Sequence, residues 1–370
     1  MNIDQITLTH VRIPLVEPFK ISNGEIAEKD AIIVGVHSEG LVGHGESSTM
    51  SGSFYSEETP ESAWDCLVSE LIPRILRSRP ASVEEVNNLM SPVSANAFAK
   101  AGIETAFWDL AALKKGISLS EHLGGKRNQV ESGLAVGIYP SIGELLLAIE
   151  KHLVEGYKRV KIKVQPGWDV KPLAEVRGAF GAIQLMVDAN CAYTQADLHH
   201  LKTLDDFGLV MIEQPLPKDD LDGHAKLQAM SQTPVCLDES AKDIPTVQRA
   251  IELKSCKIIN IKIQRVGGLL NAKRMHDVCA QAGIPVWGGT MPELGIGSAQ
   301  TLHLATLDNF IFPTDVESSR RWFVDDIIDP LIEVHDGVIT LPGQNGNGYS
   351  LNARVIEQYK VREQRFRCAL

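Results

Sequence analysis

Residues 157–169, YKRVKIKVQPGWD, place two lysines two positions apart in a run that is otherwise typical of a buried strand. Successive side chains of a strand point to opposite faces, so Lys161 and Lys163 share one face and the valines and isoleucine around them share the other. One face is therefore apolar and the other cationic. An exposed edge strand would give the same pattern, and the spacing of the neighbouring apolar runs decides between the two interpretations.

Four further apolar runs downstream also end in a charged residue. Counted from Lys163 they follow in steps of about 25 residues, and their ends are Asp188, Glu213, Asp238 and Lys262. The same step reaches SGLAVGIY around Gly137, PVWGGT around Trp287 and FIFPTDV around Asp315. Amphipathic segments of helical length separate the runs, and several end on glycine. Strand, loop and helix alternating eight times predict a TIM-type (β/α)7β barrel over residues 126–327.

An open, doubly wound sheet is the alternative architecture for alternating strands and helices. Such a sheet would carry its site on one or two loops, and a nucleotide-binding example would have a glycine-rich loop after the first strand. The segment VGGLLNAKR is too poor in glycine for that role. The barrel remains the favoured fold.

The charged strand ends would meet at one face of the barrel, because the active sites of such barrels lie at the carboxyl ends of the strands. Asp188, Glu213 and Asp238 would repel one another there unless a cation lay between them. A ligand set made only of oxygen atoms suits a hard ion. We therefore expect these three carboxylates to bind Mg²⁺, or Mn²⁺ in its place, supported by Asn190 and Glu239. Unrelated charges or salt-bridge partners at each strand end are the alternative, which the common spacing disfavours.

The lysines are candidate acid–base groups. Lys161 and Lys163 disfavour each other's protonation, and burial adds a desolvation cost, so one of them can be neutral near pH 7. Lys262 would lie on the other side of the cluster formed by the charged strand ends, and it could be a neutral base in the same way. Two amines on either side of a carboxylate substrate suit abstraction of the proton α to that carboxylate, with an enediolate intermediate.

The strand-end motifs KIK, VDAN, IEQP, LDES and NIK resemble those of the enolase superfamily, in its muconate-lactonizing subgroup. Together with AFWDLAALKKGISLSEHLGG, EGYKRVKIKVQPGWDVKPL and VWGGTMPELGIGSA, they make the chain most similar to the o-succinylbenzoate synthase and N-acylamino acid racemase family. This resemblance covers nearly the whole chain. It implies catalytic roles for Lys161, Lys163 and Lys262 and the same three metal ligands.

Two reactions of that family remain open. One is syn elimination to o-succinylbenzoate for menaquinone synthesis, and the other is 1,1-proton transfer that racemises an N-acylamino acid such as an N-succinylamino acid. Dipeptide epimerisation and muconate-type cycloisomerisation are alternatives within the subgroup. A protein of another class, which binds a metal and a carboxylate without catalysis, would not need both Lys163 and Lys262.

The two ends of the chain have a different pattern from the barrel. Residues 1–125 begin with alternating runs typical of a strand meander and continue with helical patterns, and the tail from about 328 to 370 is again strand-like. We expect both ends to form one α+β capping domain. The resemblance implies that cap loops 18–25 and 47–58 close over the barrel mouth and select the substrate. Packing against the barrel rim is the alternative for their apolar residues, which are Phe19, Ile21, Phe54 and Tyr55.

The chain departs from its closest family after two of the predicted strands. The family usually has Gly-Gly-Met-Leu-Glu-Thr where this chain has GTMPEL, and the expected pocket residues there are Gly289, Met291 and Glu293. Further on, TDVESSRRWF places Asp315 and Glu317 on one face of the chain. Two acids resemble the Asp-x-Asp with which dipeptide epimerases hold a substrate ammonium group. Neutralisation of both acids by the adjacent arginines, Arg320 and Arg321, is the alternative.

Composition indicates a globular cytoplasmic enzyme. The 370 residues, of which 44% are hydrophobic, provide ample core for two domains. A net charge of −11 without a basic run argues against nucleic acid or an anionic membrane as partner. The six cysteines have no C-x-x-C spacing, which favours reduced thiols. We expect a small carboxylate as substrate, and the resemblance implies a homo-oligomer.

Overall fold

The computed structural model describes residues 2–50 and 56–367, and it begins with a long antiparallel hairpin. Its strands are β1 (Gln5–Ile21) and β2 (Gly24–Ser38), and β3 (Leu41–Ser47) pairs with β2 on the far side. Strand β15 (Lys360–Arg367) pairs with β1, so the sheet order is β15-β1-β2-β3. The expected meander is therefore present, and the C-terminal end of the chain adds a strand to it.

Helices cover one face of this sheet. They are α1 (Pro60–Cys66), which continues through a π-helical turn (Leu67–Leu71) into α2 (Ile72–Ser78), then α3 (Val83–Met90), α4 (Ala97–Lys115) and α5 (Leu119–Leu123). Helix α4 lies directly on β3, because a Cβ atom added to Gly43 would lie 2.2 Å from the Ala106 carbonyl oxygen. From the other side of α4, buried Glu104 accepts hydrogen bonds from the Leu269 and Leu270 amides and so ties the cap to the second half of the chain.

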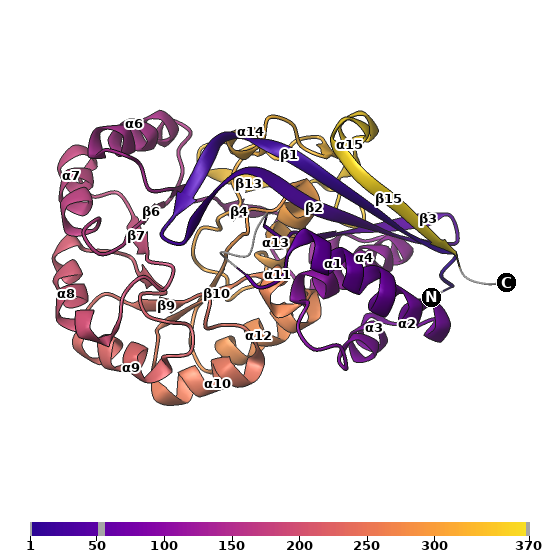
Figure 1. Cartoon of the computed structure of the whole chain (residues 1–370), viewed down its shortest axis with the longest axis horizontal. Helices are drawn as coiled ribbons and strands as arrows, with labels where there is room; N and C mark the ends of the chain where they lie inside the picture. The colour runs from indigo at the N-terminus through magenta and orange to yellow at the C-terminus, as the bar shows by residue number, and fades with distance from the viewer. Residues whose placement is uncertain (1, 51–55, 368–370) are drawn as a thin grey trace.

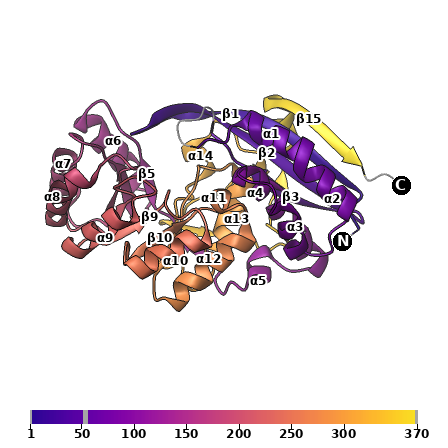
Figure 2. The same cartoon turned by 60° about the horizontal axis from the view of Figure 1, so that its bottom comes forward.

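The second half of the chain is a curled parallel sheet with its helices outside (Figures 1 and 2). In sheet order its strands are β11 (Val286–Gly288), β10 (Ile258–Ile261), β9 (Val235–Leu237), β8 (Ile212–Glu213), β7 (Leu185–Asp188), β6 (Val160–Lys163) and β5 (Leu134–Val136). The outer helices are α6 (Ile142–Leu153), α7 (Val170–Phe180), α8 (Leu198–Lys202), α9 (Leu221–Met230), α10 (Ile244–Leu253), α11 (Ile263–Val266), α12 (Leu269–Gln281) and α13 (Gly295–Leu304). Two 3-10 turns, Gln195–Asp197 and Thr203–Phe207, flank α8 where the sequence predicted one longer helix.

The predicted eighth strand is the main difference from the expected barrel. In the described residues the sheet has seven strands, and the segment around Asp315 forms isolated bridges, between Phe310 and Val286 and between Thr314 and Ser132, in place of an eighth strand. Proline lacks the amide hydrogen that a strand ladder needs, and Pro313 stands in the middle of this segment. The Arg159 guanidinium also donates hydrogen bonds to the carbonyl oxygens of Pro313 and Thr314, at 3.2 and 3.3 Å.

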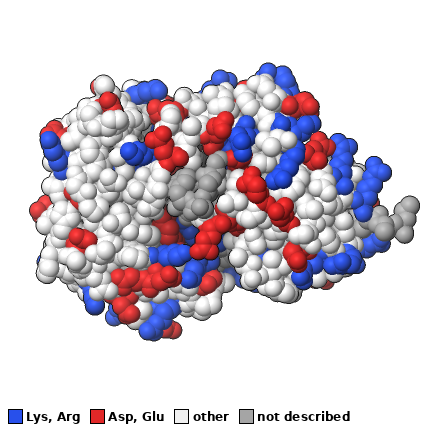
Figure 3. All heavy atoms as spheres, viewed as in Figure 1, with Lys and Arg blue, Asp and Glu red and all other residues white. Residues whose placement is uncertain are grey.

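The remaining elements of the tail form small sheets around the barrel. Strand β4 (Gln129–Glu131) pairs with β13 (Val338–Thr340), and β12 (Ile328–Asp329) pairs with β14 (Ser350–Leu351). Two short helices, α14 (Ser319–Trp322) and α15 (Ala353–Tyr359), complete the fold. No helix within residues 2–50 and 56–367 is both long and apolar enough to cross a bilayer. On the face seen in Figure 3, acidic and basic side chains of the described residues are intermixed.

Candidate active site

The five charged strand ends lie together at the carboxyl end of the parallel sheet. Lys163, Asp188 and Glu213 are the last residues of β6, β7 and β8, while Asp238 and Lys262 directly follow β9 and β10. The three carboxylates are at most 1% exposed to solvent. The cationic face of the β6 strand therefore points to a buried site, which rules out the exposed edge strand that its pattern also allowed.

Each lysine contacts carboxylates from neighbouring strands. Lys163 Nζ lies 2.6 Å from an Asp188 oxygen and also donates a hydrogen bond to Asn190 Oδ1 at 2.9 Å. Lys161 Nζ lies 3.3 Å from Glu213 and contacts the Asp315 carboxylate. Ammonium and carboxylate groups are thus in direct contact around the end of the sheet.

On the other side of the site, Lys262 Nζ lies 3.0 Å from Asp238 Oδ2. The guanidinium of Arg265, from the short helix α11, holds the same carboxylate. Arg265 was not predicted from the sequence, and its position one helical turn after Lys262 is the signal that could have identified it.

Charge interactions set the protonation states in this cluster. Burial lowers the pKa of Lys161, but the carboxylates of Asp315, Glu213 and Asp188 outweigh burial and raise that pKa above its usual value. Lys161 is therefore charged at neutral pH. Burial and the neighbouring Asp188 charge raise the pKa of Glu213 to about 8.

The carboxylates at the ends of β7 and β9, Asp188 and Asp238, have lowered pKa values. Burial alone would raise the pKa of Asp188, but Lys163 and Lys161 lower it below its usual value. Arg265 and Lys262 likewise outweigh burial and lower the pKa of Asp238. These two acids are ionised, whereas burial keeps the pKa of Glu213 above its usual value.

The residues present fit a divalent cation. Three buried carboxylates supply a ligand set made of oxygen, the type that hard ions prefer. Beside them Glu239 Oε2 is buried without a hydrogen-bond partner among the described residues, and burial with the Asp238 charge raises the pKa of Glu239 to about 7. In this structure lysine ammonium groups contact the three carboxylates. Within the described ranges, no three His, Cys, Asp or Glu side chains converge as they would around a bound metal ion.

Asn190 and Glu239 lie where the sequence placed them, next to the carboxylate cluster. The amide nitrogen of the Asn190 side chain donates to Glu239 Oε1 at 3.0 Å, while its oxygen accepts from Lys163. The backbone here is left-handed, with φ of 43° at Asn190 and 65° at Cys191. This conformation is uncommon for residues other than glycine, so the loop after β7 is held by its surroundings.

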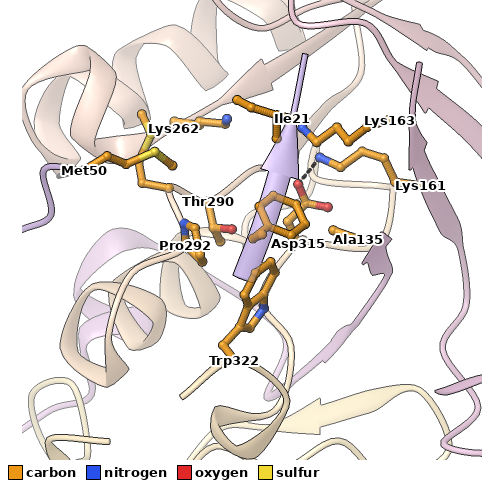
Figure 4. A pocket seen from close by; sticks show the side chains of 12 residues that line it. Ile21, Met50, Ala135, Lys161, Lys163, Lys262, Thr290, Pro292, Asp315 and Trp322 are labelled. Carbon is orange, nitrogen blue, oxygen red and sulfur yellow. Dashed lines mark hydrogen bonds and ion pairs between the residues drawn. The ribbon is translucent and has the colours of Figure 1, made fainter. Parts of the chain in front are cut away.

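The lysines border a pocket (Figure 4). Lys262 reaches it from one side and Lys161 and Lys163 reach it from the opposite side (Figure 4). The remaining walls are largely apolar and come from both cap and barrel, and the residues are Phe19, Ile21, Met50, Ala135, Thr290, Met291, Pro292, Asp315 and Trp322. The site therefore combines amines on two sides with an apolar enclosure.

Some of the expected pocket residues line the pocket and others lie outside it. Phe19, Ile21 and Met291 line the pocket, but Gly289 does not, since its amide donates to the Asn260 side chain at 2.8 Å. Glu293 is buried and accepts a hydrogen bond from the Met291 amide at 3.0 Å. The expectations for the other two cap-loop residues, Phe54 and Tyr55, lie outside the described residues.

Several lining residues were missed, among them Met50, Thr290 and Trp322. Thr290 and Met50 belong to segments that the sequence did single out, the departure after the seventh apolar run and cap loop 47–58. Trp322 directly follows the double arginine Arg320–Arg321 at the end of α14, where no periodic pattern marked it.

The two acids after the last apolar run are both paired within the protein. Asp315 Oδ1 accepts from the Arg159 guanidinium at 2.8 Å and its other oxygen contacts Lys161. Glu317 accepts from the Ala135 amide at 2.8 Å and lies 3.5 Å from Arg321 Nε, and burial raises the pKa of Glu317 to about 8. The alternative that adjacent arginines neutralise both acids is thus wrong for Asp315.

Comparison with known proteins covers nearly the whole chain. Residues 3–124 match the family "Mandelate racemase / muconate lactonizing enzyme, N-terminal domain", and residues 144–355 match "Enolase C-terminal domain-like". An o-succinylbenzoate synthase of Geobacillus stearothermophilus is 45% identical over 360 residues, which is 97% of this chain and 96% of the relative. An N-succinylamino acid racemase of Thermus thermophilus is 40% identical over 358 residues, 97% of each chain. A solved member of the enolase superfamily from Listeria innocua superposes with a TM-score of 0.95 at 35% identity, over 100% of both chains.

Proposed function

The chain belongs to the enolase superfamily and is an enzyme of that superfamily, and from this premise we propose that it abstracts the proton α to a carboxylate with Lys163 and Lys262 as its two acid–base groups. The observation that carries the proposal is the placement of these lysines on opposite sides of one pocket (Figure 4). Relatives named for o-succinylbenzoate synthesis and for N-succinylamino acid racemisation support both reactions for this site.

The two reactions use the same lysines differently. In racemisation, one amine removes the α-proton on its side of the enediolate and the other returns a proton on the opposite side. In syn elimination, a single lysine acts first as base and then as acid, and the second lysine stabilises the intermediate as a fixed cation. Lys161, held charged by Asp315 and Glu213, adds positive charge near the substrate carboxylate in both cases.

A divalent metal belongs to this proposal. We infer that Asp188, Glu213 and Asp238 would hold Mg²⁺, with Asn190 and Glu239 supporting them. When bound, the ion would supply positive charge that favours ionisation α to the carboxylate.

We further infer that the curled sheet closes as a barrel. The segment around Asp315 hydrogen-bonds to both edges of the sheet, with Ile311 N to Val286 O at 3.2 Å and Gly133 N to Thr314 O at 2.8 Å. Closure would place Asp315 in the ring beside Lys161, where it fixes that side chain.

The pocket favours an N-acylamino acid over a dipeptide as substrate. A dipeptide brings a free ammonium group that needs an available acid. Asp315 is paired with Arg159 and Lys161, and Glu317 is not among the residues that line the pocket. The other walls are apolar and include Phe19, Ile21 and Trp322, which suit an apolar side chain or acyl chain. We therefore rank dipeptide epimerisation below the two reactions named above.

An activity assay tests the proposed function. We expect the protein with Mg²⁺ to abolish the optical rotation of N-succinyl-L-phenylalanine, and to convert the hydroxylated cyclohexadiene precursor to o-succinylbenzoate, followed by ultraviolet absorbance. Chelation should stop both reactions. Turnover of neither substrate would sink the proposal, and turnover of one alone would identify the reaction that this chain performs.

Metal binding can be tested without activity. Millimolar Mg²⁺ should raise the thermal midpoint of the wild type by several degrees, because a ligand at 100 times its Kd contributes about 2.7 kcal/mol to stability. Asp238→Asn should lose this shift. Asp219→Asn, at an exposed aspartate that pairs only with Lys242, should keep it. An undiminished Mg²⁺ shift in the Asp238 variant would contradict the ligand assignment.

A further inference from the structure

The tip of the β1–β2 hairpin, defined here as residues 17–25, lies against the carboxyl end of the parallel sheet. In Figure 1 the hairpin extends from the cap sheet to the neighbourhood of β6 and β7. The Lys20 carbonyl oxygen accepts a hydrogen bond from the Ile138 amide at 2.9 Å, in the loop that follows β5. The predicted loop 18–25 is thus mostly strand, and its backbone is bonded to the barrel.

Two polar side chains at the turn extend this contact to the loop after β7. Ser22 Oγ donates to the Ala189 carbonyl oxygen at 3.3 Å. Asn23 Nδ2 donates to the Asn190 carbonyl oxygen at 3.2 Å. The acceptors belong to the left-handed loop whose Asn190 side chain contacts Lys163. The hairpin tip therefore touches the loops after two strands of the site.

The same tip carries apolar side chains to the pocket. The Phe19 ring meets the Trp322 ring edge to face, with centroids 4.8 Å apart, and lies 6.0 Å from Lys163 Nζ. At the root of the tip, Glu17 contacts Arg321 and the Tyr139 hydroxyl, each at 3.2 Å. The position of the tip consequently decides where the apolar wall of the pocket stands.

Gly137, the residue directly after β5, lies under this tip. A Cβ atom at that position would lie 2.8 Å from the Lys20 carbonyl oxygen and 3.3 Å from both the Lys20 nitrogen and Phe19 Cδ2. The closest of these atoms belongs to backbone, which cannot rotate away as a flexible side chain could. Any side chain at residue 137 must therefore displace the hairpin tip.

We propose that Gly137 is a specificity-determining position, because its missing side chain lets the hairpin tip seat on the end of β5 and holds Phe19 and Ile21 against the substrate. This inference rests on the proposed function. A displaced tip leaves the lysines and carboxylates intact but moves the apolar wall, so it should weaken discrimination between large and small substrate side chains. Displacements of about 1 Å in positioning groups can cost about 100-fold in rate.

Hydrogen exchange tests the seat independently of activity. Gly137→Ala should increase the exchange rate of a peptide containing the Ile138 amide at least tenfold, since that amide donates to Lys20. Asn23→Ala, which removes a bond without adding bulk, should act in the same direction. Gly143→Ala is the matched control, because its Cβ would have only Ser141 Oγ nearby, at 3.9 Å. Exchange at the wild-type rate in both test variants would overturn the claim that Gly137 lets the hairpin tip pack on the end of β5.

Kinetics test the specificity role. The ratio of kcat/KM for N-succinyl-phenylalanine over N-succinyl-alanine should fall about tenfold in Gly137→Ala and Asn23→Ala, and stay at the wild-type value in Gly143→Ala. Faster exchange with an unchanged ratio would overturn the specificity role. A wild type that racemises neither substrate would instead overturn the proposed function and leave the exchange result to judge the seat.

Discussion

Replacing Lys163 or Lys262 by alanine is expected to lower racemisation of an N-succinylamino acid by about 1,000-fold or more, the upper part of the range for a lost general acid–base group. Lys163 ends β6 and Lys262 directly follows β10; three strands of the sheet lie between β6 and β10, and the two side chains reach the pocket from opposite sides. In the proposed mechanism neither can do the work of the other, because each would face one side of the enediolate. Both single variants should therefore fail, and the measurement is the rate of loss of optical rotation.

Lys226→Ala is the control for that experiment. Lys226 is exposed on α9 and, among the described residues, donates only to Gln195 at 2.9 Å, so its loss should leave the rate unchanged. The Mg²⁺-dependent thermal shift of each active-site variant checks that the carboxylates are still in place. A rate within tenfold of the wild type in either lysine variant would exclude the two-base assignment.

The second large effect concerns the contribution of Asp315 to the stability of the protein. Asp315→Ala should destabilise the protein by roughly 3 kcal/mol or more, because breaking a buried ion pair leaves a buried charge without its partner. The Arg159 and Lys161 side chains that Asp315 holds are only 1% and 3% exposed. The loss should be seen as a fall of several degrees in the thermal midpoint.

The matched control is an exposed pair of the same chemistry. Asp308 pairs with Lys126 on the surface, where the two side chains are 63% and 71% exposed. Surface pairs contribute at most about 1 kcal/mol, so Asp308→Ala should scarcely move the midpoint. Equal thermal midpoints for the two variants would show that the buried ion pairs of Asp315 contribute no more to stability than the exposed pair.

Most of the site could be predicted because it follows the period of the fold. Strand ends of a parallel sheet meet at one edge, so a charged residue recurring about every 25 positions places Lys163, Asp188 and Glu213 together without knowledge of any contact. The period also located seven strands and the helices between them. Cytoplasmic location, homo-oligomerisation and the domain boundary at residue 125 stay predictions.

What could not be predicted depends on contacts between distant residues. The charge of Lys161 follows from Asp315, 154 positions away, and neither residue's local sequence shows that pair. The eighth apolar run forms isolated bridges in place of a strand; Pro313, which lacks an amide hydrogen, stands within it, and Arg159 donates to the Pro313 and Thr314 carbonyl oxygens. Trp322 reaches the pocket from α14 and Met50 from the cap, and neither segment follows the barrel period.

Solvent hydrogen exchange at the α-carbon tests the two-base account most directly. The wild type, incubated with each enantiomer of N-succinyl-phenylalanine in D₂O, should incorporate deuterium into both, as measured by proton NMR. Lys163→Ala and Lys262→Ala should each retain exchange of one enantiomer only, and the retained enantiomer should differ between the two variants. Retention of the same enantiomer by both variants, or exchange of both enantiomers by either one, would contradict the placement of the two lysines on opposite sides of the substrate.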